Sequence, residues 1–401
     1  MFESLTLARL ERQLISWRRQ LHRIPEASYK EEKTSQTIAS ELQKIGLSVQ
    51  TFSSHYGVCA VIHGSQPGPV IAFRADMDAL SIHEEVDSEF RSEHEGAMHA
   101  CGHDGHMAIL LGLASLLHKN RRQLAGTVKL FFQSAEEASP EGGAHFFLEA
   151  GLLDDVSAIF GLHLWPDLPC GEIGLRPGAL MAASDRLSIT ILGEGAHAGQ
   201  PQHGVDAITI AADVLQGISH ILSRQLDPLE TATINIGQIH GGDRYNVIAR
   251  EVVLEGTVRT LSEEVRSTLP SKLDRILAGM TASQGGSYRL NYQRGYPVLN
   301  NWPQPTTLLT KAAIKVLGAD QVHTEVKPVL AAEDFSKYLV QVPGSFFWLG
   351  CGFKDKENHG LHSPYFEIDE AALLHGVAVL YQTALLALKQ PEPVAKKPIF
   401  S

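Results

Sequence analysis

The feature that most constrains the fold is the alternation of strand-like and helical segments in the first half of the chain. Four short apolar runs read as buried strands: GVCAVIHG, PVIAFRADM, TVKLFFQSAEE and AIFGLHLW. Between the second and third runs, HMAILLGLASLLHKN has the apolar spacing of an amphipathic helix. This alternation predicts an α/β fold with a mixed, mostly parallel sheet flanked by helices.

Near Ala183 the order of elements changes. From SDRLSITILGEG to SYRLNYQRGYP the chain reads strand, helix, strand, strand, helix, strand, which is the order of a ferredoxin-like α+β domain. After Pro303 the earlier alternation returns. At 401 residues the chain also exceeds the usual size of a single core. We therefore predict a larger discontinuous domain, residues 1–185 and 298–401, interrupted by an inserted ferredoxin-like domain, residues 186–297.

Charge and hydropathy restrict the partners of the chain. Asp and Glu number 45 against 34 Lys and Arg, a formal net charge of −11, and no long basic block argues for nucleic acid. No apolar run approaches the roughly 18 residues of a membrane span, and the N-terminus lacks the apolar core of a signal peptide. Four scattered cysteines do not form a disulfide framework pattern. We expect a soluble, cytoplasmic protein with no membrane partner.

The segment MHACGHD, residues 98–104, carries the densest chemical signal. Cys101 and His103, with His106 just beyond, place a thiolate and two imidazoles in a short stretch. Such donors suit zinc or another late first-row divalent ion. The alternative is a buried cysteine beside incidental histidines. The short Cys-x-His pattern alone does not decide between the two.

Further polar residues follow the predicted strands. In an open α/β sheet, ligands bind at the carboxyl ends of the strands. The residues at those ends are Asp76, Asp78, Glu136, Glu137, His163 and His362. Each alone has an ordinary explanation as a turn residue, a helix cap, a solvated carboxylate or a packed histidine. Because they recur at strand after strand, a common cation site explains them better.

In this order, RADMDAL, MHACGHDGH, QSAEE, GLH and LHSPYF resemble the motifs of the M20 metallopeptidase family. More narrowly they resemble its subfamily D amidohydrolase branch, with hippurate hydrolases, N-acyl-amino-acid amidohydrolases, N-acetyldiaminopimelate deacetylases and auxin-conjugate hydrolases. The resemblance covers nearly the whole chain. It implies a metal-dependent hydrolase that cleaves the amide bond of an N-acyl amino acid or a related small conjugate. The larger domain would be catalytic, and the inserted domain would serve dimerisation or act as a lid.

The resemblance also implies two divalent metal ions per subunit. The implied ligands are Cys101, His103, Glu137, His163 and His362. A thiolate and a carboxylate would offset the positive charge of the ions. Zinc, manganese, cobalt and nickel all suit such a mixed site. The roles of Asp76, His106 and Glu333 stay open.

The remaining site residues are likewise implied by the resemblance. Glu136 would act as general base and then general acid, and Asp78 would steady the site. His197, in GEGAHAGQPQHGVD, would reach the active site of a partner subunit and stabilise an oxyanion, which implies a homodimer or higher homo-oligomer. Asn246 and Arg259 match positions near the substrate carboxylate or the reaction centre. Without the resemblance, the stretch around His197 would read as a surface turn.

Two departures from the branch and two alternatives complete the prediction. Ser81 stands where relatives usually have proline, and Gly199 where they have alanine. Neither change removes a ligand. Within the class, the alternative is a small-peptide hydrolase or carboxypeptidase. From another class, it is a metal-binding module without catalytic activity. The sequence does not identify the preferred acyl group.

Overall fold

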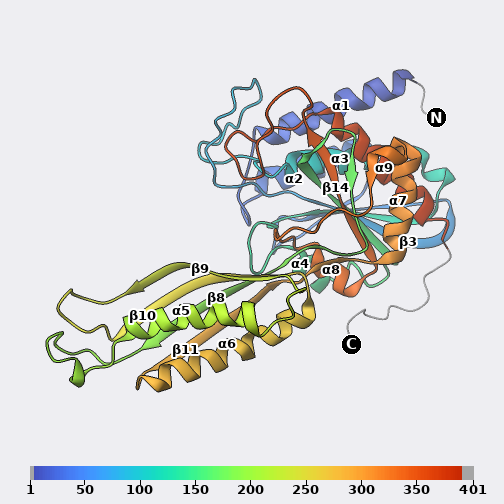
Figure 1. Ribbon diagram of the computed structural model, residues 1–401. Coiled ribbons are helices and arrows are strands. Elements are labelled where there is room, and N and C mark those ends of the chain that lie inside the picture. Colours follow the sequence, from blue (N-terminus) through green and yellow to red (C-terminus); the bar gives the residue numbers. More distant parts are fainter. Residues whose placement is uncertain (1–3, 391–401) are drawn as a thin grey trace. The chain divides into compact units, whose positions relative to one another are not determined.

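A computed structural model of the chain describes residues 4–390 and divides it into two units (Figure 1). The first unit comprises residues 1–178, 300–327 and 334–401, and the second comprises residues 179–299 and 328–333. Residues 328–333 join the second unit because Met181 and Val329 form a β-bridge, and Ala182 N–H donates to the Ala331 carbonyl at 2.9 Å. Residues 1–3 and 391–401 of the predicted larger domain lie outside the described residues.

The first unit is built on a mixed sheet of eight strands in the order β1-β2-β4-β3-β5-β14-β6-β13. Its central strands β4, β3, β5 and β14 run parallel, so their carboxyl ends meet at one edge. The strands are β1 (Val49–Thr51), β2 (Val58–His63), β3 (Gln66–Asp76), β4 (Ala125–Gln133), β5 (Ala158–Pro169), β6 (Ile173–Gly174), β13 (Val322–His323) and β14 (Gly344–Gly352). Two short strands, β7 (Gly178–Met181) and β12 (Leu299–Asn301), lie where the chain passes between the units.

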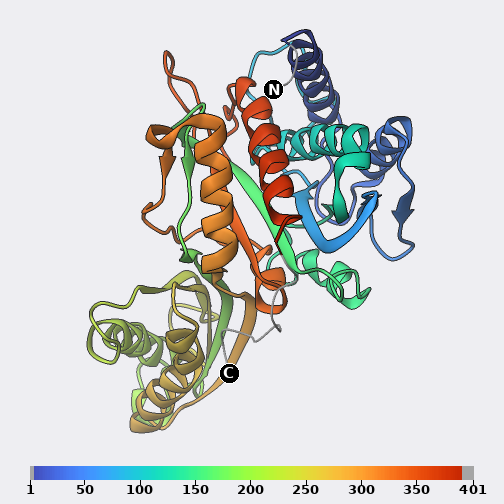
Figure 2. The ribbon, with the colours of Figure 1, turned by 90° about the vertical axis from the view of Figure 1, so that its right-hand side faces the viewer.

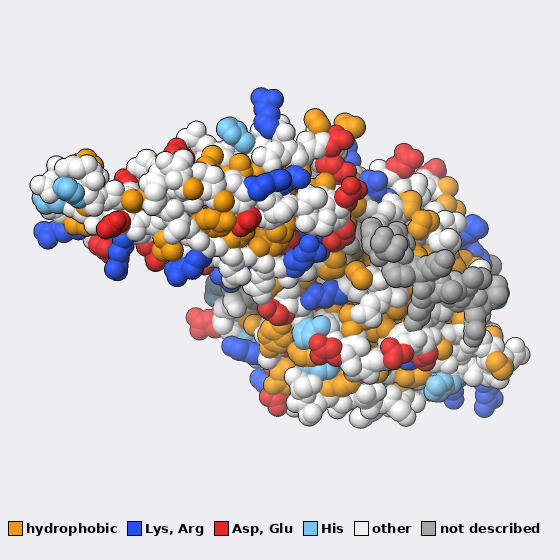
Figure 3. Space-filling view, turned by 90° about the horizontal axis from the view of Figure 1, so that it is seen from below, with side chains coloured by type: hydrophobic (Ala, Val, Ile, Leu, Met, Phe, Trp, Pro, Cys, Tyr) orange, Lys and Arg blue, Asp and Glu red, His pale blue; other side chains and the backbone are white. Residues whose placement is uncertain are grey.

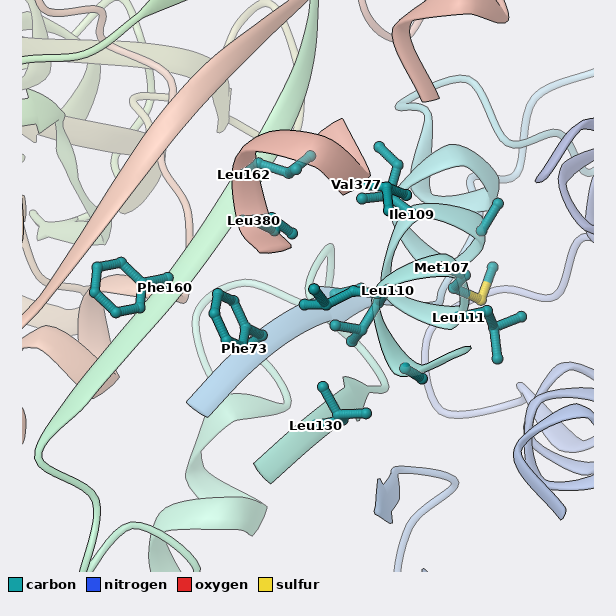
Figure 4. Close-up of a cluster of buried hydrophobic side chains, with 14 of the residues drawn as sticks. Phe73, Met107, Ile109, Leu110, Leu111, Leu130, Phe160, Leu162, Val377 and Leu380 are labelled. Carbon is teal, nitrogen blue, oxygen red and sulfur yellow. The ribbon is translucent and has the colours of Figure 1, made fainter. Parts of the chain in front are cut away.

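Helices cover this sheet. They are α1 (Ser4–His22), α2 (Glu32–Ile45), α3 (His103–Asn120), α4 (Ala144–Glu149), α7 (Pro303–Leu317), α8 (Ser336–Gln341) and α9 (Ala371–Ala387). Helices α7 and α9 lie side by side (Figure 2). In Figure 4, Leu110 of α3 points toward Phe73 and Leu130 of the sheet, while Ile109 lies beside Val377 of α9.

Helix α3 is buried on nearly every side, since 14 of its 18 residues are buried. The prediction of an amphipathic helix was therefore wrong here. The reason is that α3 packs against the sheet on one side and against α1 and α9 on the others. Polar residues in its first turn are consequently buried as well, and His103, Asp104 and His106 are all nearly inaccessible to solvent.

Strand β5 is longer than the sequence indicated. The pattern AIFGLH placed His163 at a strand end, but β5 continues six residues further, to Pro169. This expectation was wrong because β14 runs alongside the continuation and pairs Leu349 with Leu164 and Gly350 with Trp165. On its other side, β5 pairs with β3 only as far as Gly161.

The second unit has the predicted βαββαβ order. Its elements are β8 (Ala183–Leu192), α5 (Ala207–Arg224), β9 (Ala232–Gly241), β10 (Glu251–Thr260), α6 (Glu263–Ser283) and β11 (Ser287–Tyr296). The antiparallel sheet has the order β11-β8-β10-β9, and α5 and α6 pack on it around one apolar core. The face in Figure 3 carries charged side chains of both signs, with apolar ones between them.

Among the described residues, no helix has the length and apolar character that a membrane crossing requires.

Candidate active site

The sheet register brings the predicted site residues to one level. Asp76 at the end of β3 pairs with Gln133 at the end of β4. Arg74 pairs with Gly161 of β5, so Asp76, two residues later, is level with His163. The loops after β3 and β4 therefore begin beside His163, at the carboxyl edge where α/β sheets bind ligands.

The turn into α3 presents Cys101 and His103 to this edge. Gly102 between them has φ of 84°, a left-handed conformation that glycine adopts without steric cost. The chain can thus turn abruptly from Cys101 into the helix, whose first residue is His103. Both side chains are buried at the same end of α3.

All five predicted metal ligands come together around the Cys101 sulfur. Cys101 Sγ lies 3.4 Å from Nε2 of both His163 and His362, and His362 Nε2 lies 3.2 Å from Glu137 Oε1. Donor atoms within 4.8 Å of one another form two groups that share Cys101. One group adds His103 and His163, and the other adds Glu137 and His362.

Two of the imidazoles are held with Nε2 facing the cluster. His103 Nδ1 donates to the Asp78 carbonyl at 2.8 Å, and His163 Nδ1 donates to the Leu164 carbonyl at 2.7 Å. In the neutral ring, the form that binds a metal ion, each Nε2 then carries a lone pair. Among the described residues, the buried His103 Nε2 has no hydrogen-bond partner. Metal-binding histidines are oriented by such bonds through their second nitrogen.

The charges of the cluster also fit a cation. Burial and the charges of Glu137, Glu136 and Asp76 raise the pKa of the Cys101 thiol well above its usual value. Burial lowers the pKa of His103, but the charge of Asp76 and a hydrogen bond with Asp78 outweigh it and bring that pKa to about 10. Both groups retain protons because carboxylates crowd this buried space, and divalent ions would neutralise the same charge.

His106, whose role the sequence left open, faces the strands instead of the cluster. Its Nδ1 donates to Asp76 Oδ1 at 2.6 Å, and its Nε2 accepts from the Leu164 N–H at 2.9 Å. Both ring nitrogens are therefore engaged. Asp76 in turn accepts from Arg74 at 2.7 Å. His106 and Asp76 thus connect α3 to β3 and β5 directly behind the ligands.

Glu136 and Asp78 both lie close to Glu137. Glu136 is only 6% exposed, and its Oε1 accepts from the Asp334 N–H at 3.2 Å. Asp78 Oδ2 accepts from the Glu137 N–H at 2.9 Å and from Ser28 Oγ at 2.7 Å. The structure therefore places Glu136 beside the cluster and uses Asp78 to hold the backbone at Glu137.

Sequence reasoning missed the buried residues that hold this arrangement. Asp334 accepts hydrogen bonds from Arg74, from Gln133 and from the backbone amides of Gly143 and Ala144. Arg74 could have been noticed, because a charged residue inside the apolar run PVIAFRAD must find a buried partner. Asp334 gave no signal in the sequence beyond its position directly after Glu333.

In the second unit, His197 and Asn246 lie next to each other. A β-bridge joins His197 to Val247, and the Ala198 N–H donates to the Asn246 carbonyl at 3.1 Å. Both residues line a pocket of about 490 Å³. The Gly199 N–H donates to His197 Nδ1 at 2.9 Å, so the neutral ring carries its proton on Nε2. His197 is exposed and presents this N–H as a donor.

Arg259 is not part of this pocket. It lies near the end of β10, where it pairs with Ser184, whereas Asn246 lies ahead of the start of that strand. At about 3.3 Å per residue, the length of β10 separates the two by roughly 25 Å. Within one chain, the structure therefore does not bring Arg259 to Asn246 or His197.

Comparisons with known proteins give the same assignment as the site. The model of peptidase family M20/M25/M40 matches residues 72–386. An N-acyl-L-amino acid amidohydrolase of Geobacillus stearothermophilus is 45% identical, over 72% of this chain and 78% of its own. Thermostable carboxypeptidase 1 of Saccharolobus solfataricus is 38% identical, over 95% of this chain and 96% of its own.

A solved structure agrees in fold. It is a dinuclear metal-binding peptidase of the M20 family from Bacillus subtilis, 36% identical, with a TM-score of 0.84 over 95% of this chain and 99% of that one. Both the extent of the family match and the identity over nearly full-length relatives confirm the predicted family: the chain belongs to peptidase family M20/M25/M40.

Proposed function

We propose that the chain hydrolyses the amide bond of an N-acyl amino acid or a similar small conjugate and releases a carboxylic acid and an amino acid. The observation that carries this proposal is the position of Glu136 directly beside a five-residue donor cluster centred on Cys101. The 45% identity to an N-acyl-L-amino acid amidohydrolase supports the substrate class.

The residues that would hold two divalent ions are Cys101, His103, Glu137, His163 and His362. Bound there, such ions polarise the amide carbonyl and lower the pKa of water. Zinc, manganese, cobalt and nickel all accept this mixture of sulfur, nitrogen and oxygen donors. The dinuclear metal-binding peptidase with the same fold supports a count of two.

Glu136 is the proton carrier in this mechanism. Its carboxylate takes a proton from the attacking water and delivers a proton to the leaving amine. The Asp334 N–H at 3.2 Å from Glu136 Oε1 holds one carboxylate oxygen in a fixed direction. Asp78 maintains the geometry by holding the Glu137 amide and the His103 ring at the same time.

His197, Asn246 and Arg259 complete the site as parts of a homodimer. His197 presents an Nε2–H donor that suits a developing oxyanion, and the guanidinium of Arg259 suits the substrate carboxylate. Because roughly 25 Å of β10 separates the two residues, one copy of the second unit serves two different active sites. His197 and Asn246 then act in the partner's site, and Arg259 acts in its own. The four unpaired cysteines support the expected cytoplasmic location.

The test is Glu136→Gln, with the exposed Glu141→Gln in the same loop as matched control. Metal-reconstituted enzyme is screened for amine release from hippurate, N-acetyl amino acids, N-acetyldiaminopimelate and indole-acetyl amino acids. We expect Glu136→Gln to bind two metal ions but to lose kcat by about 100- to 10,000-fold, and Glu141→Gln to match the parent enzyme. Normal kcat in Glu136→Gln would refute the assignment, as would the absence of cleavage with every metal tried.

The carboxypeptidase relative supports a second candidate, the hydrolysis of small peptides. The same screen decides between the two if each N-acetyl amino acid is paired with a dipeptide that has the same carboxy-terminal residue and a free amino terminus. A higher kcat/KM for the N-acyl compound favours the amidohydrolase. A higher kcat/KM for the dipeptide favours the peptidase.

A further inference from the structure

The residue before Glu136 has an unusual backbone conformation. Ala135 has φ of 59°, in the left-handed region that residues with a Cβ atom rarely occupy, and its side chain is fully buried. It follows β4 by two residues and turns the chain toward the cluster. Such a conformation persists only where neighbouring groups enforce it, and it is typical of functional sites.

Two buried carboxyl groups hold the amides on either side of Glu136. Glu31 Oε1 accepts from the Ala135 N–H at 2.7 Å, and Asp78 Oδ2 accepts from the Glu137 N–H at 2.9 Å. The backbone amides of the residues before and after Glu136 are therefore held by side chains from outside their own loop. Glu31 is 104 residues away from Ala135 in the sequence.

The position of Glu31 makes this contact informative. Glu31 is the N-cap residue of α2, where a carboxylate would ordinarily accept from the first amides of its own helix, but its side chain makes no such bond. Glu26 does so instead and accepts from the amides of Lys33 at 3.2 Å and Thr34 at 2.8 Å. Among the described residues, Ala135 is the only one outside this segment whose backbone amide donates to the Glu31 side chain.

The environment of Glu31 is costly for a carboxyl group. Glu31 is 0% exposed, and among the described residues its Oε2 has no hydrogen-bond partner. Burial and the charge of Asp78 raise the pKa of Glu31 to about 8. A polar group buried at such a cost, away from the ligands themselves, indicates a specific task.

We infer that Glu31 is a positioning residue, whose carboxyl oxygen holds Ala135 in its left-handed conformation and thereby aims the Glu136 carboxylate for proton transfer. This inference rests on the proposed function of Glu136. Glu31 is not one of the predicted ligands, and its hydrogen bond to this loop is to the Ala135 amide. Its loss should therefore slow the chemical step without changing metal or substrate binding.

Three variants separate the acceptor from the rest of the side chain. Glu31→Gln keeps a neutral oxygen acceptor in place, Glu31→Asp withdraws it by one methylene, and Glu31→Met removes it at similar length. We expect near-parental kcat for Glu31→Gln and an intermediate loss for Glu31→Asp. For Glu31→Met we expect a loss of about 100-fold, which is the scale of a small misplacement of a reacting group. KM and metal content should stay at the parental values in all three.

Glu26→Met is the matched control. It makes the same substitution in the same segment and removes a carboxylate that also accepts backbone amides, but those amides belong to the start of α2. We expect Glu26→Met to lower Tm while kcat stays at the parental value. If Glu31→Met does not fold, the comparison of Glu31→Gln with Glu31→Asp tests the same acceptor.

Glu136→Gln, run in parallel, separates the two proposals. If Glu136→Gln is inactive but Glu31→Asp and Glu31→Met keep parental kcat, the inference about Glu31 is wrong and the proposed function stands. Equal loss in Glu31→Gln and Glu31→Met would also overturn the inference, because the acceptor would then be irrelevant. If Glu136→Gln is fully active, the proposed function of Glu136 fails instead.

Discussion

His103 and His106 lie three residues apart on α3, yet the structure gives their ring nitrogens opposite uses. His103 Nε2 is buried toward the cluster, whereas both nitrogens of His106 bind protein groups, Asp76 and the Leu164 amide. A buried group that loses its partner costs about 1 to 3 kcal/mol. The two histidines should therefore differ in what their removal changes.

We predict that His103→Ala lowers the bound metal below two ions per subunit, while His106→Ala retains two. His106→Ala should instead lower the free energy of unfolding by about 2 to 4 kcal/mol, because it leaves a cavity and removes the partners of Asp76 and Leu164. Elemental analysis after dialysis measures the metal, and urea unfolding measures the stability. Loss of one metal ion in His106→Ala would show that His106 is a ligand after all.

The donors could be predicted from the sequence, but the residues that hold them could not. Thiol, imidazole and carboxylate groups identify themselves by chemical type, and Cys101, His163 and His362 duly meet in the structure. Asp334 and Gln133, by contrast, are ordinary polar residues whose contact joins positions 201 residues apart. No local pattern encodes such a pairing, because it depends on which strands and loops the whole sheet places side by side.

At the scale of elements, the second unit depends on a buried carboxylate. Asp185 of β8 forms an ion pair with Arg266 of α6 at 2.6 Å and accepts from Tyr292 Oη of β11 at 2.7 Å. Burial raises the pKa of Asp185, but Arg266, Tyr292 and the Gly295 amide lower it by more than burial raises it. The pKa of Asp185 therefore lies below its usual value. Asp185 thus joins one helix and two strands.

The sign of the resulting pH dependence follows from this lowered pKa. The unfolded carboxylate titrates near pH 3.9, so the contribution of Asp185 is complete above that pH and is lost as the pH falls through the lower folded pKa. We predict that Asp185→Asn lowers the opening free energy of the second unit at pH 7 by about 3 kcal/mol. The difference from the parent should narrow as the pH falls from about 5 to below 3.

Hydrogen exchange of β8 and α6 amides, followed by mass spectrometry, measures this opening directly. The matched control is Asp274→Asn, because Asp274 also accepts from a tyrosine, Tyr288, at 2.6 Å, but at the exposed surface. Its loss should change stability by less than about 0.5 kcal/mol. A pH-independent difference between parent and Asp185→Asn would contradict the assigned shift.

Element boundaries show where sequence patterns fall short. The order of strands and helices in both units follows from apolar periodicity, because each element must bury one face. The extent of β5 past His163 and the burial of α3 depend on neighbours, β14 for the strand and α1 with α9 for the helix. A repeating pattern of apolar residues indicates that one face of an element is buried. It does not indicate that a second layer of the protein covers the opposite face.

At the scale of the whole molecule, the proposed homodimer accounts for the distribution of the predicted site residues over β10. His197 and Asn246 lie before the start of this strand and Arg259 lies near its end. Homo-oligomers are most often twofold dimers. In such a dimer, each contact between two residues of different chains occurs twice, with the two chains exchanged. In the proposed dimer, each active site would receive Arg259 from one chain and His197 from the other.

Subunit mixing tests this arrangement. His197→Ala and Glu136→Gln should each be inactive alone, since every site lacks either the oxyanion donor or the proton carrier. After the two are denatured together and refolded in equal amounts, half of the dimers are mixed, and each mixed dimer has one site with both residues intact. About a quarter of the parental activity should therefore return.

The control is a mixture of Glu136→Gln with Glu31→Met, which should show no such recovery. In each mixed dimer, one chain has lost the Glu136 carboxylate and the other has a misplaced one, so both proton carriers are impaired. If His197→Ala is inactive alone and neither mixture regains activity, His197 acts in its own chain's site. A fully active His197→Ala would place His197 outside catalysis.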